Sequence, residues 1–282
     1  MWNFFPVIKT KGNEKRNSLR GGVIMIKGLY TAYTGLVNEQ NRMDILTNNL
    51  ANASTVGYKR EGATSKSFED ILTVKLKDVS VGERNVQRTG INNPGVNIGT
   101  YYTDYSQGSF RFTGNTYDLA LAGNGFFALE FTNKAGETST RYTRDGQFTL
   151  NKEGFLVGSE GDYVLDTSSR RIRLDTLKDS AIDSAGRIFQ NDVQVAQIGV
   201  VDFEDYSYLE KYGENYYIAT EGAAPKEAEA GIESGYLEMS NVQTVSEMVN
   251  LISITRAYES NQKIMQTMDS TLETAVSLGK VR

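Results

Sequence analysis

The sequence contains neither cysteine nor histidine, although it is 282 residues long. Without these side chains the chain cannot form a disulfide, a thiolate or imidazole metal site, or a Cys–His or Ser–His catalytic arrangement. Carboxylates, lysines and tyrosines are the groups left for chemistry, and we expect no metal ion and no cofactor. Proline is scarce, at 3 residues, while glycine is abundant, at 27, which is typical of a β domain with many glycine turns.

Long apolar runs and concentrated positive charge are also missing. No stretch approaches the roughly 20 apolar residues that a helix needs to cross a bilayer, so we expect no membrane insertion. The formal net charge is −5, and the lysines and arginines are dispersed. A nucleic-acid-binding surface needs clustered positive charge, so nucleic acid is not an expected partner. The charged fraction of 23% and the hydrophobic fraction of 39% are ordinary for one or two folded domains.

The longest stretch with a single period lies near the end of the chain, over residues 240–278. Seam residues recur every seven positions in two offset series, which is the pattern of a helix that packs a narrow stripe against another helix. The series are Leu251, Tyr258, Met265 and Leu272, and Ile254, Asn261, Met268 and Ala275. Capping-box spacings that begin at Ser240 and Thr244 mark the start. We therefore predict a C-terminal coiled-coil helix over residues 236–282.

A second seven-residue series near the other end predicts a helix over about residues 27–52. It contains Leu29, Leu36, Met43 and Leu50, and Glu39 interrupts its companion series. Two interpretations are open: the two helices form a hairpin within one chain, or their seams meet other copies of the chain. Asn261 at a seam position favours the second, because a buried polar group fixes register and partner at a cost in stability.

The end of this helix and the residues that follow it are rich in short polar side chains, with Asn48, Asn49 and Asn52 among them. Such side chains compete for backbone hydrogen bonds and end helices, so we assign residues 25–60 to the helix and its exit. The same amides could also join neighbouring backbones.

Residues 1–24 differ in character from the rest of the chain. They have no sustained apolar region and no small-residue cleavage site, so they do not resemble a secretory signal. Arg20-Gly21-Gly22 can be encoded by a purine-rich sequence of the kind that binds ribosomes, and Met25 follows at a suitable distance. We interpret residues 1–24 as an untranslated or disordered leader.

The middle of the chain predicts a β domain. Over residues 101–220, apolar and polar residues alternate, and glycine-containing turns such as Asp145-Gly146 separate the runs. Residues 61–100 are interpreted as an extended linker or ribbon, and residues 221–235 as a polar linker. The predicted class is α+β: an antiparallel β-rich central domain inserted between N- and C-terminal helices that pair as a coiled coil.

Two features of the β region suggest chemistry but fit structural roles better. Residues 123–128 match the G-x-G-x-x-A spacing of a dinucleotide site, yet the residues that follow continue as a strand, where that site needs a helix. Acidic residues are plentiful over residues 162–205, in predicted turns where aspartate is common. The rival hypothesis is a β-rich carboxylate hydrolase that acts on a cell-wall polymer and needs two carboxylates across a cleft.

Four separated motifs resemble those of bacterial flagellar rod and hook proteins, and together they extend over essentially residues 25–282. Two lie in the β region, at Gly123–Phe127 and at Tyr142–Gly146 with Gly154–Val157. The terminal motifs are residues 28–36, 47–53 and 57–59, and residues 235–242, 247–249 and 256–259.

The resemblance implies a non-enzymatic axial subunit of the flagellar basal body, outside the cytoplasmic membrane, that polymerises into the torque-transmitting rod. Paired terminal helices would line a central channel, with the β domain outside. The implied partners are other copies of the chain, neighbouring rod and hook proteins, and the flagellar export apparatus. A β region of about 120 residues leaves room for one domain, which favours a rod protein, preferably of the distal type, over a hook protein. A proximal rod protein is a further alternative.

The seams and the asparagine-rich exit supply the predicted subunit contacts. These residues are Leu29, Leu36, Met43, Asn48, Asn49, Leu50, Asn52, Leu251, Ile254, Tyr258, Asn261, Met265, Met268 and Leu272.

Overall fold

The computed structural model describes residues 12–75, 87–133, 136–213 and 215–280. The chain divides into two compact units: residues 1–47, 62–102 and 248–282 belong to unit 1, and residues 48–61 and 103–247 to unit 2. Of the predicted leader, residues 1–11 lie outside the described part, whereas residues 12–24 have helical backbone.

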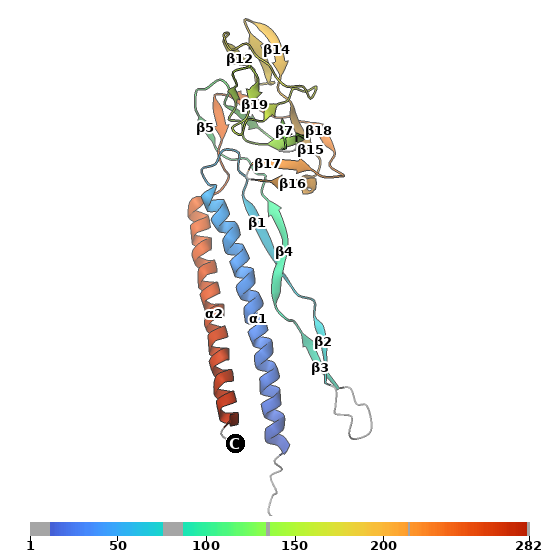
Figure 1. Ribbon diagram of the computed structural model, residues 1–282, viewed down its shortest axis with the longest axis vertical. Helices are drawn as coiled ribbons and strands as arrows, with labels where there is room; N and C mark the ends of the chain where they lie inside the picture. Colours follow the sequence, from blue (N-terminus) through green and yellow to red (C-terminus); the bar gives the residue numbers. More distant parts are fainter. Residues whose placement is uncertain (1–11, 76–86, 134–135, 214, 281–282) are drawn as a thin grey trace, which may run out of the picture. The chain divides into compact units, whose positions relative to one another are not determined.

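Two helices dominate unit 1 and run antiparallel side by side (Figure 1). α1 spans Gly12–Ala51 and α2 spans Thr244–Lys280. α1 therefore begins well before the predicted residue 27, and α2 begins at the second of the two capping positions. The predicted pair of terminal helices and the α+β class are confirmed.

Two short ladders of strands complete unit 1. β1 (Glu61–Ser67) pairs with β4 (Val96–Thr103), and β2 (Ile71–Lys75) pairs antiparallel with β3 (Gln87–Asn92). These strands occupy the residues that the sequence predicted to form an extended ribbon. The side-chain amide of Asn38 on α1 donates a hydrogen bond to Ser65 Oγ on β1, at 3.1 Å.

Unit 2 is built on a nine-stranded sheet with the main order β16-β17-β8-β7-β11-β10-β9, in which β15 pairs with both β7 and β18. Every pairing in this sheet is antiparallel, as predicted. The strands are β7 (Phe126–Thr132), β8 (Thr138–Thr143), β9 (Thr149–Leu150), β10 (Leu156–Val157), β11 (Tyr163–Val164), β15 (Val200–Phe203), β16 (Leu209–Tyr212), β17 (Tyr216–Ala219) and β18 (Pro225–Glu227).

Three smaller sheets and a short helix complete the described part of unit 2. The 3₁₀ helix η1 (Tyr206–Tyr208) lies between β15 and β16. β12 (Ser180–Ile182), β13 (Arg187–Gln190) and β14 (Val193–Gln197) form one sheet, β6 (Leu119–Ala122) pairs with β19 (Gly231–Ser234), and β5 (Phe110–Phe112) pairs with β20 (Tyr236–Glu238).

Strand β7 separates two hydrophobic cores. Phe127 belongs to the larger core and its neighbour Phe126 to a smaller aromatic one, because successive side chains of a strand point to opposite faces. The larger core includes Leu121, Phe148, Leu156, Ile172 and Ile188, and the smaller includes Phe203, Leu209 and Tyr217. A strand that is buried on both faces loses the simple alternation that sequence analysis looks for.

The glycines of the G-x-G-x-x-A segment form a bend between strands β6 and β7. Gly123 and Gly125 have φ angles of +123° and +140°, in the region that favours glycine. β7 begins at the next residue, Phe126, so no helix starts where a dinucleotide site would need one.

Residues 221–235 correct the prediction of a polar linker. They contain β18, which pairs with β15, and β19, which pairs with β6. Their polar composition arises because all three residues of β18 are exposed, and Ile232 is the one buried residue of β19. Residues 236–238, predicted to open the C-terminal helix, are likewise strand β20.

Candidate subunit interface

The predicted seam of α2 is the stripe that faces away from solvent. From residue 248 to 279, Ile254 is the one fully buried position, at 6% exposure. Six other seam positions are half-buried, namely Leu251, Tyr258, Asn261, Met265, Met268 and Leu272, while Ala275 and most positions between the seam residues are exposed. The seam is therefore partly covered within a single chain.

The matching face of α1 approaches α2 through two glycines. A Cβ atom built at Gly35 would lie 3.1 Å from Asn261 Nδ2, and one built at Gly28 would lie 2.6 Å from Met268 Cε. Leu29, Leu36, Met43 and Leu50 on α1 are half-buried. The chain thus forms an intramolecular helical hairpin, the first of the two interpretations. The two glycines were missed as packing residues, although their spacing of seven matches the seam.

A polar hollow of about 140 Å³ interrupts the contact between the helices. It is lined by Glu39, Arg42, Asn250, Ser253, Ile254 and Ala257. Arg42 pairs with Glu39 at 3.2 Å on α1. This explains why Glu39 interrupts the seven-residue series: the helices do not close tightly at this level.

The three predicted asparagines differ in what their side chains reach. Asn49 is fully buried, and its Oδ1 accepts from the Tyr58 hydroxyl at 3.1 Å and the Glu61 backbone at 2.9 Å, while its Nδ2 donates to the Glu61 carbonyl at 2.8 Å. Asn52 Nδ2 donates to Asn48 Oδ1 at 2.8 Å. Asn49 and Asn52 therefore hold the exit of α1 in its own chain, and Asn48 alone has an exposed side chain.

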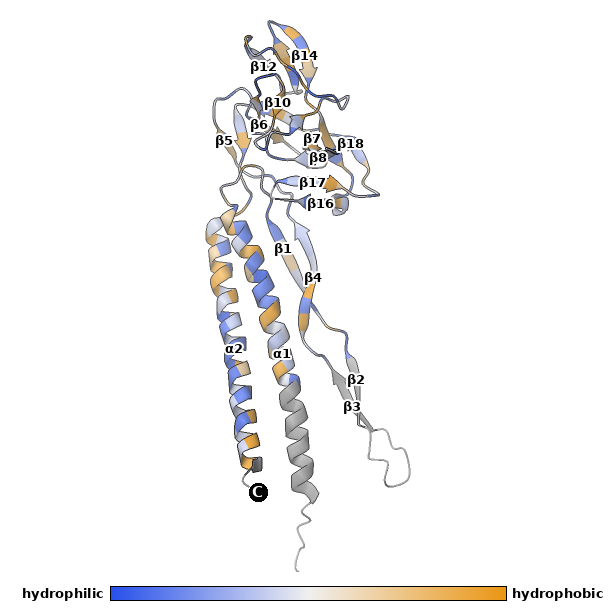
Figure 2. Cartoon of the chain, viewed as in Figure 1, coloured by the Kyte–Doolittle hydropathy of each residue, from blue (hydrophilic) through white to orange (hydrophobic). Residues whose placement is uncertain are grey.

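The first turns of α2 carry a second set of apolar side chains, which the seam analysis missed. Val245, Met248, Val249 and Ile252 are 74%, 50%, 61% and 53% exposed, and we call them the exposed apolar row. Their spacing of i, i+3, i+4 and i+7 places them on one face of the helix. That spacing was visible in the sequence but was obscured by the stronger seven-residue pattern. Figure 2 shows apolar residues along α2.

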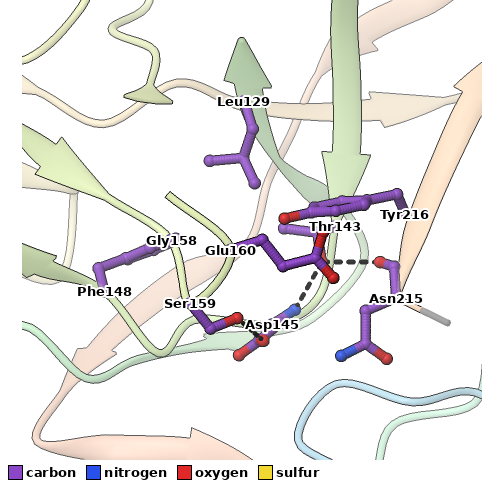
Figure 3. A pocket seen from close by; sticks show the side chains of 9 residues that line it. All are labelled: Leu129, Thr143, Asp145, Phe148, Gly158, Ser159, Glu160, Asn215 and Tyr216. Atoms are coloured by element: carbon purple, nitrogen blue, oxygen red, sulfur yellow. Dashed lines mark hydrogen bonds between the residues drawn. The ribbon is translucent and has the colours of Figure 1, made fainter. Parts of the chain in front are cut away.

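The described part of unit 2 contains one small cavity that two acidic residues line. Asp145 lines a cavity of about 10 Å³ together with Glu160 and Tyr216 (Figure 3). Burial raises the pKa of Asp145, whose carboxylate accepts from the Gln147 backbone at 3.0 Å and from Ser159 Oγ at 3.2 Å. A cavity of this size holds about one water molecule, which is too little for a sugar ring.

Most of the turn acids have the structural role that the sequence predicted. Asp175, Asp183 and Asp205 each accept a hydrogen bond from a backbone N–H one or two residues further along the chain. The described residues contain no group of acidic side chains arranged to hold a metal ion. Within the same residues, neither helix combines the length and the apolar character needed to span a membrane.

Three family profiles match successive parts of the chain. They are described as flagella basal body rod protein, over residues 29–59, flagellar hook protein FlgE/F/G D1 domain, over residues 120–202, and flagellar basal body rod FlgEFG protein C-terminal, over residues 233–278.

Whole-chain relatives are similar over nearly their full length. The flagellar basal-body rod protein FlgG of Bacillus subtilis (strain 168) is 33% identical over 270 residues, which covers 90% of this chain and 99% of the relative. The flagellar basal-body rod protein FlgF of Caulobacter vibrioides is 37% identical over 260 residues, with 91% and 100% covered. The FlgF protein of Mesorhizobium japonicum is 33% identical over 259 residues, with 90% and 99% covered.

Proposed function

The chain belongs to the family of flagellar basal-body rod proteins, and on this premise we propose that it polymerises through an apolar face of its C-terminal helix. Proteins of this family are structural subunits of the basal body, not enzymes, and this chain is such a subunit, located in the flagellar basal body. Its partners are other rod and hook subunits. The proposal concerns how the subunit makes contact with them.

The exposed apolar row carries this proposal. Its four side chains lie on one face of α2 and are each at least half exposed. Isolated exposed apolar residues are normal, but a contiguous row on a helix marks an interaction surface. In a subunit that assembles with its own kind, the natural occupant is a different face of the helical hairpin of another copy.

The geometry suits an open polymer. Rod subunits that contact one another head to tail, through different surfaces, build a helical filament when the rotation between them does not close. A tube built in this way would transmit torque mechanically, without catalysis. Neighbouring rod and hook proteins would continue the same contacts at its ends.

The predicted interface residues divide into two roles in this account. The seam residues of α1 and α2 hold the hairpin together and so keep the exposed apolar row in place. Contact between the seam and neighbouring copies stays a prediction, as does contact through the exposed side chain of Asn48. Asn49 and Asn52 act within the chain through the hydrogen bonds given above.

We infer that the helical hairpin is weakly ordered before assembly and becomes stable in the rod. Its core is thin, since Ile254 is the one fully buried residue among the described positions of α2 beyond residue 247. Regions with few buried apolar contacts open easily. Such a chain is suited to passing unfolded through the flagellar export apparatus, and the lack of cysteine removes disulfides as an obstacle.

Within the family we propose a rod protein of the distal type. The β region accommodates one domain, which favours a rod protein over a longer hook protein. Relatives named FlgG and FlgF match at similar identity, so a proximal rod protein is the alternative. Experiments should distinguish it from a distal rod protein. The native position of the subunit in isolated basal bodies would decide between them.

The test compares Ile252→Lys with the matched control Gln262→Lys, which places the same charge at an exposed polar position of the same helix. Each variant is expressed in cells that lack the native protein, and completed rods and swimming are scored. We expect Ile252→Lys to prevent rod completion and Gln262→Lys to support it, with both purified monomers equally stable. Normal rods with Ile252→Lys would contradict the proposed contact.

A further inference from the structure

We propose that Lys59, Glu238 and Arg144 form a buried latch that makes both segments adjoining the helices fold with the β domain in the free chain. The latch joins the segment after α1, the strand before α2 and the turn after β8. It concerns unit 2 alone and does not depend on how copies of the chain assemble.

The three side chains are almost completely removed from water. Lys59 and Glu238 are each 1% exposed and Arg144 is 2% exposed. Lys59 Nζ lies 2.6 Å from Glu238 Oε1, and Arg144 Nη1 lies 3.3 Å from Glu238 Oε2. Glu238 therefore receives one cation on each carboxylate oxygen. Each cation comes from a different part of the sequence.

Two backbone groups add hydrogen bonds to the pair, whereas the buried Nε of Arg144 has no hydrogen-bond partner among the described residues. Lys59 Nζ also donates to the Ser106 carbonyl at 2.8 Å, and the Gly108 N–H donates to Glu238 Oε1 at 2.9 Å. The loop between β4 and β5 is thus the fourth segment that the latch joins. Burial lowers the pKa of Lys59, and the Glu238 carboxylate opposes that shift.

A second layer of contacts joins the same segments. The Gly57 N–H donates to the Glu238 carbonyl, and the Arg60 N–H donates to Asn241 Oδ1, both at 2.8 Å. The Arg60 side chain pairs with Glu247 at 3.1 Å, in the first turn of α2. The two segments are therefore paired over several residues, although Lys59 and Glu238 are separated by 179 positions in the chain.

The energetic character of such a cluster explains why it acts as a latch. A buried ion pair adds little stability over well-packed apolar residues, but removal of one partner leaves an uncompensated buried charge and is strongly destabilising. Lys59, Arg144 and Glu238 are therefore acceptable inside the protein only when all three segments are in place. Partly docked arrangements are excluded by the same charges.

The test is amide hydrogen exchange on the full chain, with Glu238→Gln as the variant. In the wild type we expect residues 56–61 and 236–241 to be as protected as strands β6 and β7. In Glu238→Gln we expect the two segments to exchange about 100-fold faster than those strands, since loss of one buried partner removes several factors of ten in the opening equilibrium. The control is Glu130→Gln, which makes the same change in the exposed pair with Arg171.

Two results would overturn the proposal. One is fast exchange of both segments in the wild type while β6 and β7 are protected. The other is an equal increase in the exchange rates of the two segments and of strands β6 and β7 in Glu238→Gln. If Glu238→Gln fails to fold, Lys59→Met and Lys59→Met/Glu238→Gln complete the comparison. The double variant should then be less disrupted than either single variant, and a double variant as disrupted as Glu238→Gln would also contradict the latch.

Discussion

Gly57 is the residue at which the exit of α1 is most tightly constrained. Its φ angle is +69°, and a Cβ atom there would collide with the backbone of Arg144 and Asp145. Gly161 has a φ angle of +94° but open space around its Cα. The two glycines share a left-handed backbone and differ in their surroundings.

We therefore expect Gly57→Ala to destabilise the protein more than Gly161→Ala. Placing an L-residue in the left-handed region costs about 1–2 kcal/mol, and this alone should act at Gly161. In Gly57→Ala the new Cβ must also displace the neighbouring backbone of Arg144 and Asp145. This variant should therefore lower the free energy of unfolding at least twice as much as Gly161→Ala does. Urea unfolding of the full-length variants, followed by circular dichroism, measures both. If both variants lost the same free energy of unfolding, the backbone of Gly57 would not be tightly packed against Arg144 and Asp145.

Asp145 provides a prediction on pH. Because burial raises its pKa in the folded protein above the usual 3.8, the folded state binds its proton more tightly than the unfolded state does. Its contribution to stability is complete below pH 3.8 and is lost as pH rises through the folded-state pKa. Asp145→Asn should therefore be more stable than the wild type at pH 7, with the advantage shrinking in acid.

Asp183→Asn is the control with the opposite sign. The hydrogen bond from Arg187 lowers the pKa of the exposed Asp183 carboxyl, so its stabilising effect is present above pH 3.8 and lost in acid. This variant should be slightly less stable than the wild type at pH 7. Unfolding midpoints between pH 3 and pH 8 test the pair. If both variants, or neither of them, were more stable than the wild type at pH 7, the raised pKa assigned to Asp145 would be contradicted.

At the scale of single elements, the helical hairpin can be tested by cross-linking, because the chain has no native cysteine. Gly35→Cys/Asn261→Cys places two thiols at one of the two close approaches between α1 and α2. We expect a disulfide within one chain under dilute oxidising conditions. Gly35→Cys/Gln262→Cys is the control, since the exposed Gln262 lies one position off the seam. Disulfides formed mainly between chains would favour the interpretation that the seams meet other copies.

The sequence was most informative where one period governs a long element. The α2 seam predicted from residues 251–272 is the partly buried stripe of the structure, because a seven-residue repeat has a direct geometric meaning in a helix. Alternation was less reliable in the strands. Phe112 and Val193 lie in strands of the predicted β region but are 70% and 65% exposed, since alternation identifies a strand without saying which face is covered.

Contacts between distant segments could not be predicted from pattern. Nothing in the local sequence connects Lys59 with Glu238, and a lone lysine or glutamate is normally exposed. The packing role of the two glycines of α1 was also missed. Their neighbours are supplied by tertiary packing, which a single sequence without a fold does not specify. Strands β18 and β19 were missed because their residues are mostly polar or partly exposed.

At the scale of the whole molecule, the chain combines two units with different degrees of burial. Unit 2 contains both hydrophobic cores and the buried latch, whereas the described part of α2 in unit 1 is mostly exposed. We therefore infer that unit 2 supplies the stable folded body and that the helices gain their full stability from neighbouring subunits. A rod subunit built in this way would be monomeric before assembly and stiff after it.

Hydrogen exchange over residues 248–280, measured on the purified monomer and on the assembled polymer, tests this central claim most directly. We predict rapid exchange of these amides in the monomer and slow exchange in the polymer, with β6 and β7 strongly protected in both states. Strong protection of residues 248–280 in a verified monomer would contradict the account, because the two helices would then satisfy each other without a second copy.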